Sequence, residues 1–274
     1  MRITGRWVRH CGFAFFALTI ASAPAPGEPA KEYAPRVGQP GKDVVWVPTP
    51  EALVDRMLEL GRVTPKDYLI DLGSGDGRTV ITAAKRGTRA HGIEYNSDMV
   101  ELSKRNAAAE GVGDRATFAK ADLFESDFSR ATVITMFLLP QINLKLRPKI
   151  LELKPGTRIV SNSFTMGEWQ EDESASIDGD CSGWCTALLW IVPAKVAGTW
   201  QFADGEIILE QRYQMISGSL RAGGRTAPLV GARLRGDEIY IRTADNEYRG
   251  NVSGDTISGT SKNGAEWKAI RSPR

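Results

Sequence analysis

A glycine-rich turn at residues 71–78, DLGSGDGR, constrains the fold of this 274-residue chain more than any other segment. It follows the apolar segment 68–70, which predicts a short buried strand. The three glycines allow the backbone of the turn to approach a ligand closely. The dinucleotide spacing G-x-G-x-x-G fails because residue 78 is arginine, and the lysine of a P-loop is missing. The turn therefore predicts a strand–turn–helix unit that binds a different ligand.

Short apolar segments alternate with helical patterns on both sides of this turn. Strands are expected at residues 68–72, 89–94, 116–120, 131–137, 158–162 and 186–193, and helices at 78–86, 97–110, 141–153 and from Pro50. This alternation predicts an α/β domain over residues 48–193, with a doubly wound parallel sheet covered by helices on both faces. Ligands of such folds lie at the carboxyl ends of the strands. Within the domain, the acidic segment 167–180 is expected to be a solvated loop, with a lid or a lip for a cationic substrate as the alternatives.

The helical signal disappears after residue 193. Residues 198–274 contain about eight short alternating runs separated by turn residues, two of them with glycine leading a two-residue hairpin loop. This spacing predicts a second, all-β domain, an antiparallel meander closed into a small barrel. Trp200 and Trp267 are expected in its core.

Residues 1–30 have the layout of a secretory signal peptide. Three arginines precede the uncharged stretch 11–23, which is shorter than the roughly 20 residues of a membrane-spanning helix, and a Pro-rich segment follows. The expectation is an exported, secreted or periplasmic protein. An uncleaved anchor, which would place the protein at a membrane, is the alternative. Residues 31–47, rich in proline and glycine, are expected to form an extended lead-in.

The balanced charge and the small numbers of histidines and cysteines argue against several classes of function. Removing residues 1–30 leaves 32 basic and 32 acidic residues, so composition does not favour a nucleic-acid partner. His91 is the single histidine after the leader, which excludes His-dependent triads, multi-His metal sites and His general bases unless His91 acts alone. Cys181 and Cys185 are too few for a structural zinc site and are expected as a local disulfide or two free thiols. No metal site is predicted.

Acidic residues end three successive predicted strands. Asp71 would repel a phosphate and suits the ammonium or sulfonium of a cationic ligand. Glu94, 23 positions later, can accept hydrogen bonds from ribose hydroxyls. Asp122 can accept a hydrogen bond from an adenine amino group. Each alone is as consistent with a turn or helix-cap residue. Together they predict a site for a sulfonium nucleoside along one edge of the sheet.

The motifs DLGSGDG, IEYN and ADL resemble those of class I S-adenosylmethionine-dependent methyltransferases over about residues 44–193. The resemblance implies a seven-stranded, Rossmann-like methyltransferase sheet and S-adenosylmethionine as the cofactor. It also implies the contacts of the cofactor. The methionine part would meet Asp71, Gly73, Ser74 and Gly75, the ribose would meet Glu94 in the triplet with Tyr95 and Asn96, and the adenine would meet Asp122 and Leu123.

One subgroup is more similar. WVPTP before the first helix and the apolar segment 137–141 resemble protein-lysine methyltransferases whose known members act on mitochondrial carriers and the ATP synthase c-subunit. This resemblance implies that Pro48 and Thr49, with Val47, pack against the cofactor. The chain departs from that family by adding the C-terminal β-domain and the leader.

The methyl acceptor is expected beside Phe137 and Pro140, at the end of the fourth strand. An apolar mouth there would lower the pKa of a lysine amine; residues 137–140 as plain core are the alternative. The polar-Pro-Pro-aromatic and Pro-Cys motifs of nucleobase methyltransferases are missing. We therefore expect a protein-lysine methyltransferase. The alternatives are a methyltransferase for a small molecule, a catalytically silent protein whose β-domain is a binding module, and, more weakly, an NAD-dependent oxidoreductase.

Overall fold

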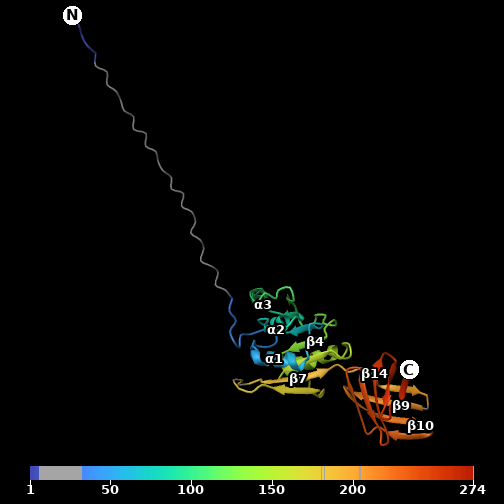
Figure 1. Ribbon diagram of the computed structural model, residues 1–274. Coiled ribbons are helices and arrows are strands. Elements are labelled where there is room, and N and C mark those ends of the chain that lie inside the picture. The colour runs from blue at the N-terminus through green and yellow to red at the C-terminus, as the bar shows by residue number, and fades with distance from the viewer. Residues whose placement is uncertain (6–32, 180, 182, 204, 274) are drawn as a thin grey trace. The chain divides into compact units, whose positions relative to one another are not determined.

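The computed structural model describes residues 1–5, 33–179, 181, 183–203 and 205–273 (Figure 1). Residues 34–274 form one compact unit. Most of the predicted signal peptide lies outside the described residues. Within the described part of the chain, no helix is both long enough and apolar enough to cross a membrane.

The first domain is built on a seven-stranded sheet of mixed direction. Its helices are α1 (Glu51–Leu60), α2 (Arg78–Lys85), α3 (Ser97–Ala109) and α4 (Pro140–Ile150). Its strands are β1 (Tyr68–Leu72), β2 (Arg89–Glu94), β3 (Ala116–Lys120), β4 (Val133–Met136), β5 (Arg158–Asn162), β6 (Glu173–Ser176) and β7 (Thr186–Ile191). The strand order is β3-β2-β1-β4-β5-β7-β6. The first five of these strands run parallel to one another.

The expectation of a wholly parallel sheet is wrong at one edge. Strand β7 runs antiparallel to β5, and β6 runs antiparallel to β7. Among the described residues between β5 and β7 there is no helix to carry the chain back across the sheet, and a parallel pairing needs such a crossover. Strand β6 also lies inside the acidic segment that was expected to be a loop.

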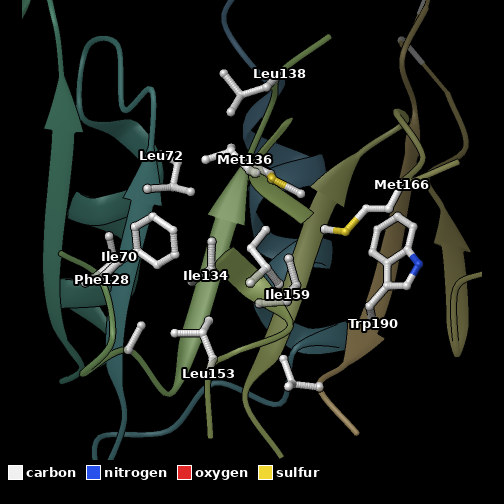
Figure 2. Close-up of a cluster of buried hydrophobic side chains, with 14 of the residues drawn as sticks. Ile70, Leu72, Phe128, Ile134, Met136, Leu138, Leu153, Ile159, Met166 and Trp190 are labelled. Carbon is white, nitrogen blue, oxygen red and sulfur yellow. The ribbon is translucent and has the colours of Figure 1, made fainter. Parts of the chain in front are cut away.

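Consecutive strand residues point to opposite faces of the sheet. A cluster of buried apolar side chains covers each face of its central strands. Figure 2 shows one cluster, in which Ile70 and Leu72 of β1 lie beside Ile134 and Met136 of β4. Helix α4 packs against this face with Ile142, Leu146 and Ile150. The intervening residues Leu69, Ala90 and Val133 join α1, α2 and α3 in a second cluster on the other face.

The second domain is a closed antiparallel barrel. Its strands are β8 (Gly198–Phe202), β9 (Gly205–Arg212), β10 (Met215–Ala222), β11 (Arg225–Pro228), β12 (Gly231–Arg235), β13 (Glu238–Arg242), β14 (Glu247–Ser253), β15 (Thr256–Ser261) and β16 (Glu266–Arg271). Among the described residues, eight strands form a ring that the β9–β10 pairing closes, and β11 adds to β10. Trp200 is fully buried in the barrel, as predicted, whereas Trp267 is only partly buried and meets Tyr248 edge-on.

The acidic segment 167–180 joins the sheet domain to the barrel. Asp172, whose side chain is 1% exposed, pairs with Arg233 of β12 at 2.6 Å and accepts a hydrogen bond from the Ile191 amide at 2.8 Å. Glu173 pairs with Arg235 of the same strand. In addition, the rings of Trp169 and Tyr213 stack with centroids 5.9 Å apart. The segment is therefore a partner for barrel arginines and not a free solvated loop.

We expect Asp172→Ala to lower the free energy of unfolding by about 1–3 kcal/mol, because the Ile191 amide and Arg233 both lose their acceptor. Urea unfolding followed by circular dichroism measures this loss. The control is Glu101→Ala, which breaks the exposed pair with Lys104 and should change stability by less than about 0.5 kcal/mol. Equal effects of the two variants would contradict the role of Asp172.

Candidate functional site

A single pocket collects the three acidic residues that end the predicted strands. Asp71, Glu94 and Asp122 all line it, together with the glycine turn after β1. It lies at the carboxyl ends of β1 to β4, where ligands bind in folds of this kind. The predicted cofactor residues Pro48, Thr49, Gly73, Ser74, Gly75, Tyr95, Asn96 and Leu123 line the same pocket.

Asp71 is buried at the base of this pocket. Its side chain accepts a hydrogen bond from the hydroxyl of Thr135 on β4 at 2.6 Å. Burial raises the pKa of Asp71 to about 7; the Thr135 hydrogen bond opposes this shift, and repulsion from Glu94 and Asp76 adds to it. A cation bound beside Asp71 would favour its ionised form. The residue thus suits a positively charged ligand, as its position in the sequence predicted.

The glycine turn is held against the end of β2 by Glu94. The carboxylate accepts hydrogen bonds from the backbone amides of Gly75 at 3.0 Å and Asn96 at 2.9 Å. Each carboxylate oxygen keeps a second lone pair that can accept from a hydroxyl. Gly75 has φ +54°, and a Cβ added there would lie 2.6 Å from the indole nitrogen of Trp46. A side chain at position 75 would therefore fill the cradle.

Side chains that the sequence analysis missed fix the same turn from α3. The Ser103 hydroxyl donates to the carbonyl of Gly75 at 2.9 Å, and the Asn106 amide donates to the carbonyl of Asp76 at 3.0 Å. Gly77, at φ +84°, packs so tightly that an added Cβ would lie 2.9 Å from Ser103. Helical spacing predicted α3 but did not reveal which of its polar residues face inward.

Asp76 forms an ion pair with Arg78, whereas Asp71 has no ion pair among the described residues. The Arg78 guanidinium bonds to the Asp76 carboxylate at 2.6 to 3.2 Å and donates to the carbonyl of Thr49 at 2.8 Å. Arg78 thereby links the glycine turn to the segment that precedes α1. Thr49 itself is buried.

The lead-in segment folds over the pocket. The backbones of Gly38 and Gln39 bond to Trp46, and Pro40 bridges Val45. The tip of this small loop carries Lys42, whose ammonium pairs with Asp122 and lies 5.1 Å from the centre of the Tyr95 ring.

Lys42 occupies the carboxylate that was predicted to bind the adenine amino group, that of Asp122. A hydrogen bond from Lys42 lowers the pKa of the Asp122 carboxyl and raises the pKa of the Lys42 ammonium. The other Asp122 oxygen accepts from the Phe124 amide at 2.9 Å. A nucleobase amino group at Asp122 would therefore share this carboxylate with Lys42 or displace it. Sequence reasoning missed Lys42 because it lies 80 residues away.

One polar atom of the pocket lacks a protein partner. The Ser74 hydroxyl is buried and has no hydrogen-bond partner among the described residues. Buried hydroxyls are normally hydrogen-bonded, and this one lies against Gly92 of β2, where a Cβ would be 2.5 Å from it. The site thus offers carboxylates for a cation and for hydroxyls, next to the glycine turn and apolar walls. This donor and acceptor set fits a sulfonium nucleoside.

Of the two residues predicted for the acceptor mouth, Phe137 lines the pocket and Pro140 does not. Phe137, Leu138 and Leu139 line the pocket after β4. Pro140 is the first residue of α4. Proline is common at this position because its missing amide has no helical partner there.

Two aromatic residues outside the predicted set complete this end of the pocket. The ring centre of Phe137 lies 5.8 Å from those of Phe164 and Trp184, and the latter two rings are 6.4 Å apart. Both added residues line the pocket. Trp184 lies in the loop that the disulfide between Cys181 and Cys185 closes. A Phe and a Trp in loops carry no spacing signal, so the sequence did not reveal them.

Comparison with known proteins identifies relatives of the first domain. Residues 71–173 match the family model described as the ANTKMT methyltransferase domain. A protein-lysine N-methyltransferase of Saccharolobus islandicus is 46% identical over 153 residues, which cover 54% of this chain and 94% of the relative. The human lysine N-methyltransferase of the ATP synthase c-subunit is 35% identical over 128 residues, 46% of this chain and 54% of the relative. This chain thus spans about half the length of the human protein.

One similar protein of known structure was solved with a bound ligand. The RNA methyltransferase from Salinibacter ruber in complex with S-adenosyl-L-homocysteine is 47% identical to this chain, with a TM-score of 0.52. The match covers 55% of this chain and 96% of that one. These matches leave nearly half of this chain uncovered. They establish S-adenosylmethionine as the cofactor, and the chain belongs to the protein-lysine N-methyltransferase family of the class I S-adenosylmethionine-dependent methyltransferases.

Proposed function

We propose that this protein transfers a methyl group from S-adenosylmethionine to the side-chain amine of a protein lysine. The observation that carries the proposal is the convergence of Asp71, Glu94 and the glycine turn on one pocket, next to the apolar segment after β4. Two similar proteins are named as lysine N-methyltransferases, which supports a lysine as the acceptor.

The residues of the pocket divide between the two substrates. We assign the methionine part of the cofactor to Asp71, Ser74 and the backbone of Gly73 and Gly75, the ribose to Glu94, and the adenine to Asp122 with Leu123. Tyr95, Asn96, Pro48 and Thr49 would complete its walls. When bound, the cofactor supplies an electrophilic methyl group on a sulfonium. Binding in this mode requires Lys42 to share or release Asp122.

Phe137, Leu138 and Leu139 prepare the acceptor amine in this proposal. A lysine attacks through the lone pair of its neutral form, and removal from water favours that form by lowering the pKa of the amine. These side chains exclude water on the acceptor side of the pocket. Alignment of the amine then supplies most of the catalysis, since no covalent enzyme intermediate is needed.

An RNA acceptor, suggested by the name of the Salinibacter protein, is disfavoured by charge. Residues 31–274 carry 32 basic and 32 acidic residues, and the basic residues of the pocket, Lys42 and Arg78, are engaged with Asp122 and Asp76. RNA backbones are bound chiefly through unpaired lysines and arginines. A protein amine, which is cationic in water, is the better match to this pocket.

We expect Glu94→Ala to weaken S-adenosylmethionine binding at least about 100-fold, because the ribose loses its acceptor and the glycine turn loses its tie to β2. Isothermal calorimetry measures the affinity, and transfer of a labelled methyl group to cell extracts and membranes measures activity. Glu101→Ala, on the exposed face of α3, is the control.

The same assay separates the alternatives. Label in a protein, mapped to a lysine by mass spectrometry, supports the proposal. Label in a small molecule or in RNA would overturn the acceptor, and cofactor binding without any transfer would favour a silent protein whose barrel acts as a binding module. Affinity retained in Glu94→Ala would refute the assigned cofactor site.

The raised pKa of Asp71 predicts how cofactor affinity depends on pH. Because the pKa is about 7, Asp71 is ionised above this pH and neutral below it. Its attraction for a cationic ligand is therefore present at high pH and lost as the pH falls through 7, weakening affinity by up to about tenfold per unit. Calorimetry from pH 8 to 6 should show this slope in the wild type and a smaller one in Asp71→Asn. Identical slopes would contradict a contact between Asp71 and the cation.

We propose that the protein is exported, by virtue of residues 1–30. The disulfide between Cys181 and Cys185 supports an oxidising compartment, because such bonds are rare where thiols are kept reduced. Fractionation and N-terminal sequencing of the native protein should find it outside the cytoplasm, beginning after residue 23, 25 or 30. Uncleaved protein in the membrane fraction would favour the anchor, and uncleaved protein in the cytoplasm would refute export.

A further inference from the structure

Three aromatic side chains meet at the acceptor end of the pocket although they come from separate segments. Phe137 follows β4, Phe164 follows β5, and Trp184 precedes β7. These strands are neighbours in the sheet, and β7 runs antiparallel to β5, so all three residues emerge at the same edge. We call Phe137, Phe164 and Trp184 the aromatic trio. Its ring centres are 5.8, 5.8 and 6.4 Å apart, and all three residues line the pocket.

Two residues in the segments that carry the trio have a strained backbone conformation. Trp184 itself has φ +56°, and Ser163, which precedes Phe164, has φ +57°. Non-glycine residues rarely adopt this region, and such strain persists where surrounding structure enforces it. Trp184 lies in the short loop that the disulfide between Cys181 and Cys185 closes. Trp184 nevertheless remains 49% exposed, so its position is not explained by burial in the core.

The electrostatic surroundings favour a cation beside the trio. Aromatic faces attract cations through their quadrupole. In the same pocket Asp76 and Asp122 are paired with Arg78 and Lys42, whereas Asp71 and Glu94 have no basic side chain within 4 Å among the described residues.

We propose that the aromatic trio binds the acceptor amine and stabilises the positive charge that forms on its nitrogen, with the Cys181–Cys185 disulfide positioning Trp184. The inference rests on the proposed methyl transfer to an amine and specifies its acceptor site. It assigns Phe164 and Trp184 to acceptor recognition, and it predicts that the site distinguishes a cationic head group from a neutral one of equal shape.

The charge balance of the transfer explains why such a site is useful. The lone pair of the neutral amine forms a bond to the methyl carbon while the carbon–sulfur bond breaks, and that electron pair stays on sulfur. The positive charge therefore moves from sulfur to nitrogen, and the methylammonium later releases a proton to water. Aromatic faces beside the nitrogen meet the charge where it develops.

A matched pair of ligands tests the inference on the full-length oxidised protein. The probes are Nα-acetyl-Nε-trimethyl-lysine amide and its neutral isostere, in which a tert-butyl group replaces the trimethylammonium. Affinities are measured by ligand-observed NMR titration with S-adenosylhomocysteine present. We expect the cationic probe to bind about three- to tenfold more tightly than the neutral one.

Variants connect that preference to the trio. Trp184→Ala and Phe164→Ala should abolish it, Trp184→Phe should retain most of it, and Cys181→Ser/Cys185→Ser should reduce it with unchanged affinity for S-adenosylhomocysteine. Tyr240→Ala, which removes an aromatic ring of the barrel outside the pocket, is the control and should behave as the wild type.

The outcomes separate this inference from the proposed function. Equal affinities of the two probes in the wild type, or a preference that survives in Trp184→Ala, would overturn the role of the trio even if methyl transfer to lysine is observed. A preference that disappears in Trp184→Ala supports the trio. Absence of transfer to any amine would instead refute the proposed function, whatever the probes show.

Discussion

The hydrogen bonds from the amides of Gly75 and Asn96 to the carboxylate of Glu94 are the constraint on which the pocket depends. They join the turn after β1 to the turn after β2, and so set the distance between the two halves of the cofactor site. Position 75 also requires glycine, because the indole of Trp46 occupies the space that a side chain would need. The Glu94 carboxylate therefore serves structure and ligand binding together, and its free lone pairs are available because the backbone fixes its orientation.

The reversal of direction at β7 links this pocket to the rest of the molecule. Because β7 is antiparallel to β5, its first residue lies at the ligand edge of the sheet, and the disulfide loop that precedes it brings Trp184 to Phe137 and Phe164. The same strand leads out of the sheet toward the barrel. In the acidic segment that precedes it, Asp172 pairs with Arg233 of β12 and Glu173 pairs with Arg235 of the same strand.

These two connections suggest a division of labour within the chain. The parallel strands β1, β2 and β3 lead into the pocket residues Asp71, Glu94 and Asp122. The match to the Saccharolobus relative covers about half of the chain. The β5–β7 edge carries the aromatic side chains and the contacts to the barrel.

The sequence by itself determined the parts of this protein that depend on local pattern. Periodicity located the strands from β1 to β5 and the barrel, and glycine spacing with strand-end carboxylates located Asp71, Glu94 and Asp122 around one pocket, since parallel strands end at a common edge. Only the tertiary structure decided the direction of β6 and β7, the pairing of the acidic segment with barrel arginines, the contact of Lys42 with Asp122 and the meeting of the aromatic trio. Each of these joins residues tens of positions apart whose side chains have no periodic signal, so their partners are set by how the sheet and the barrel pack.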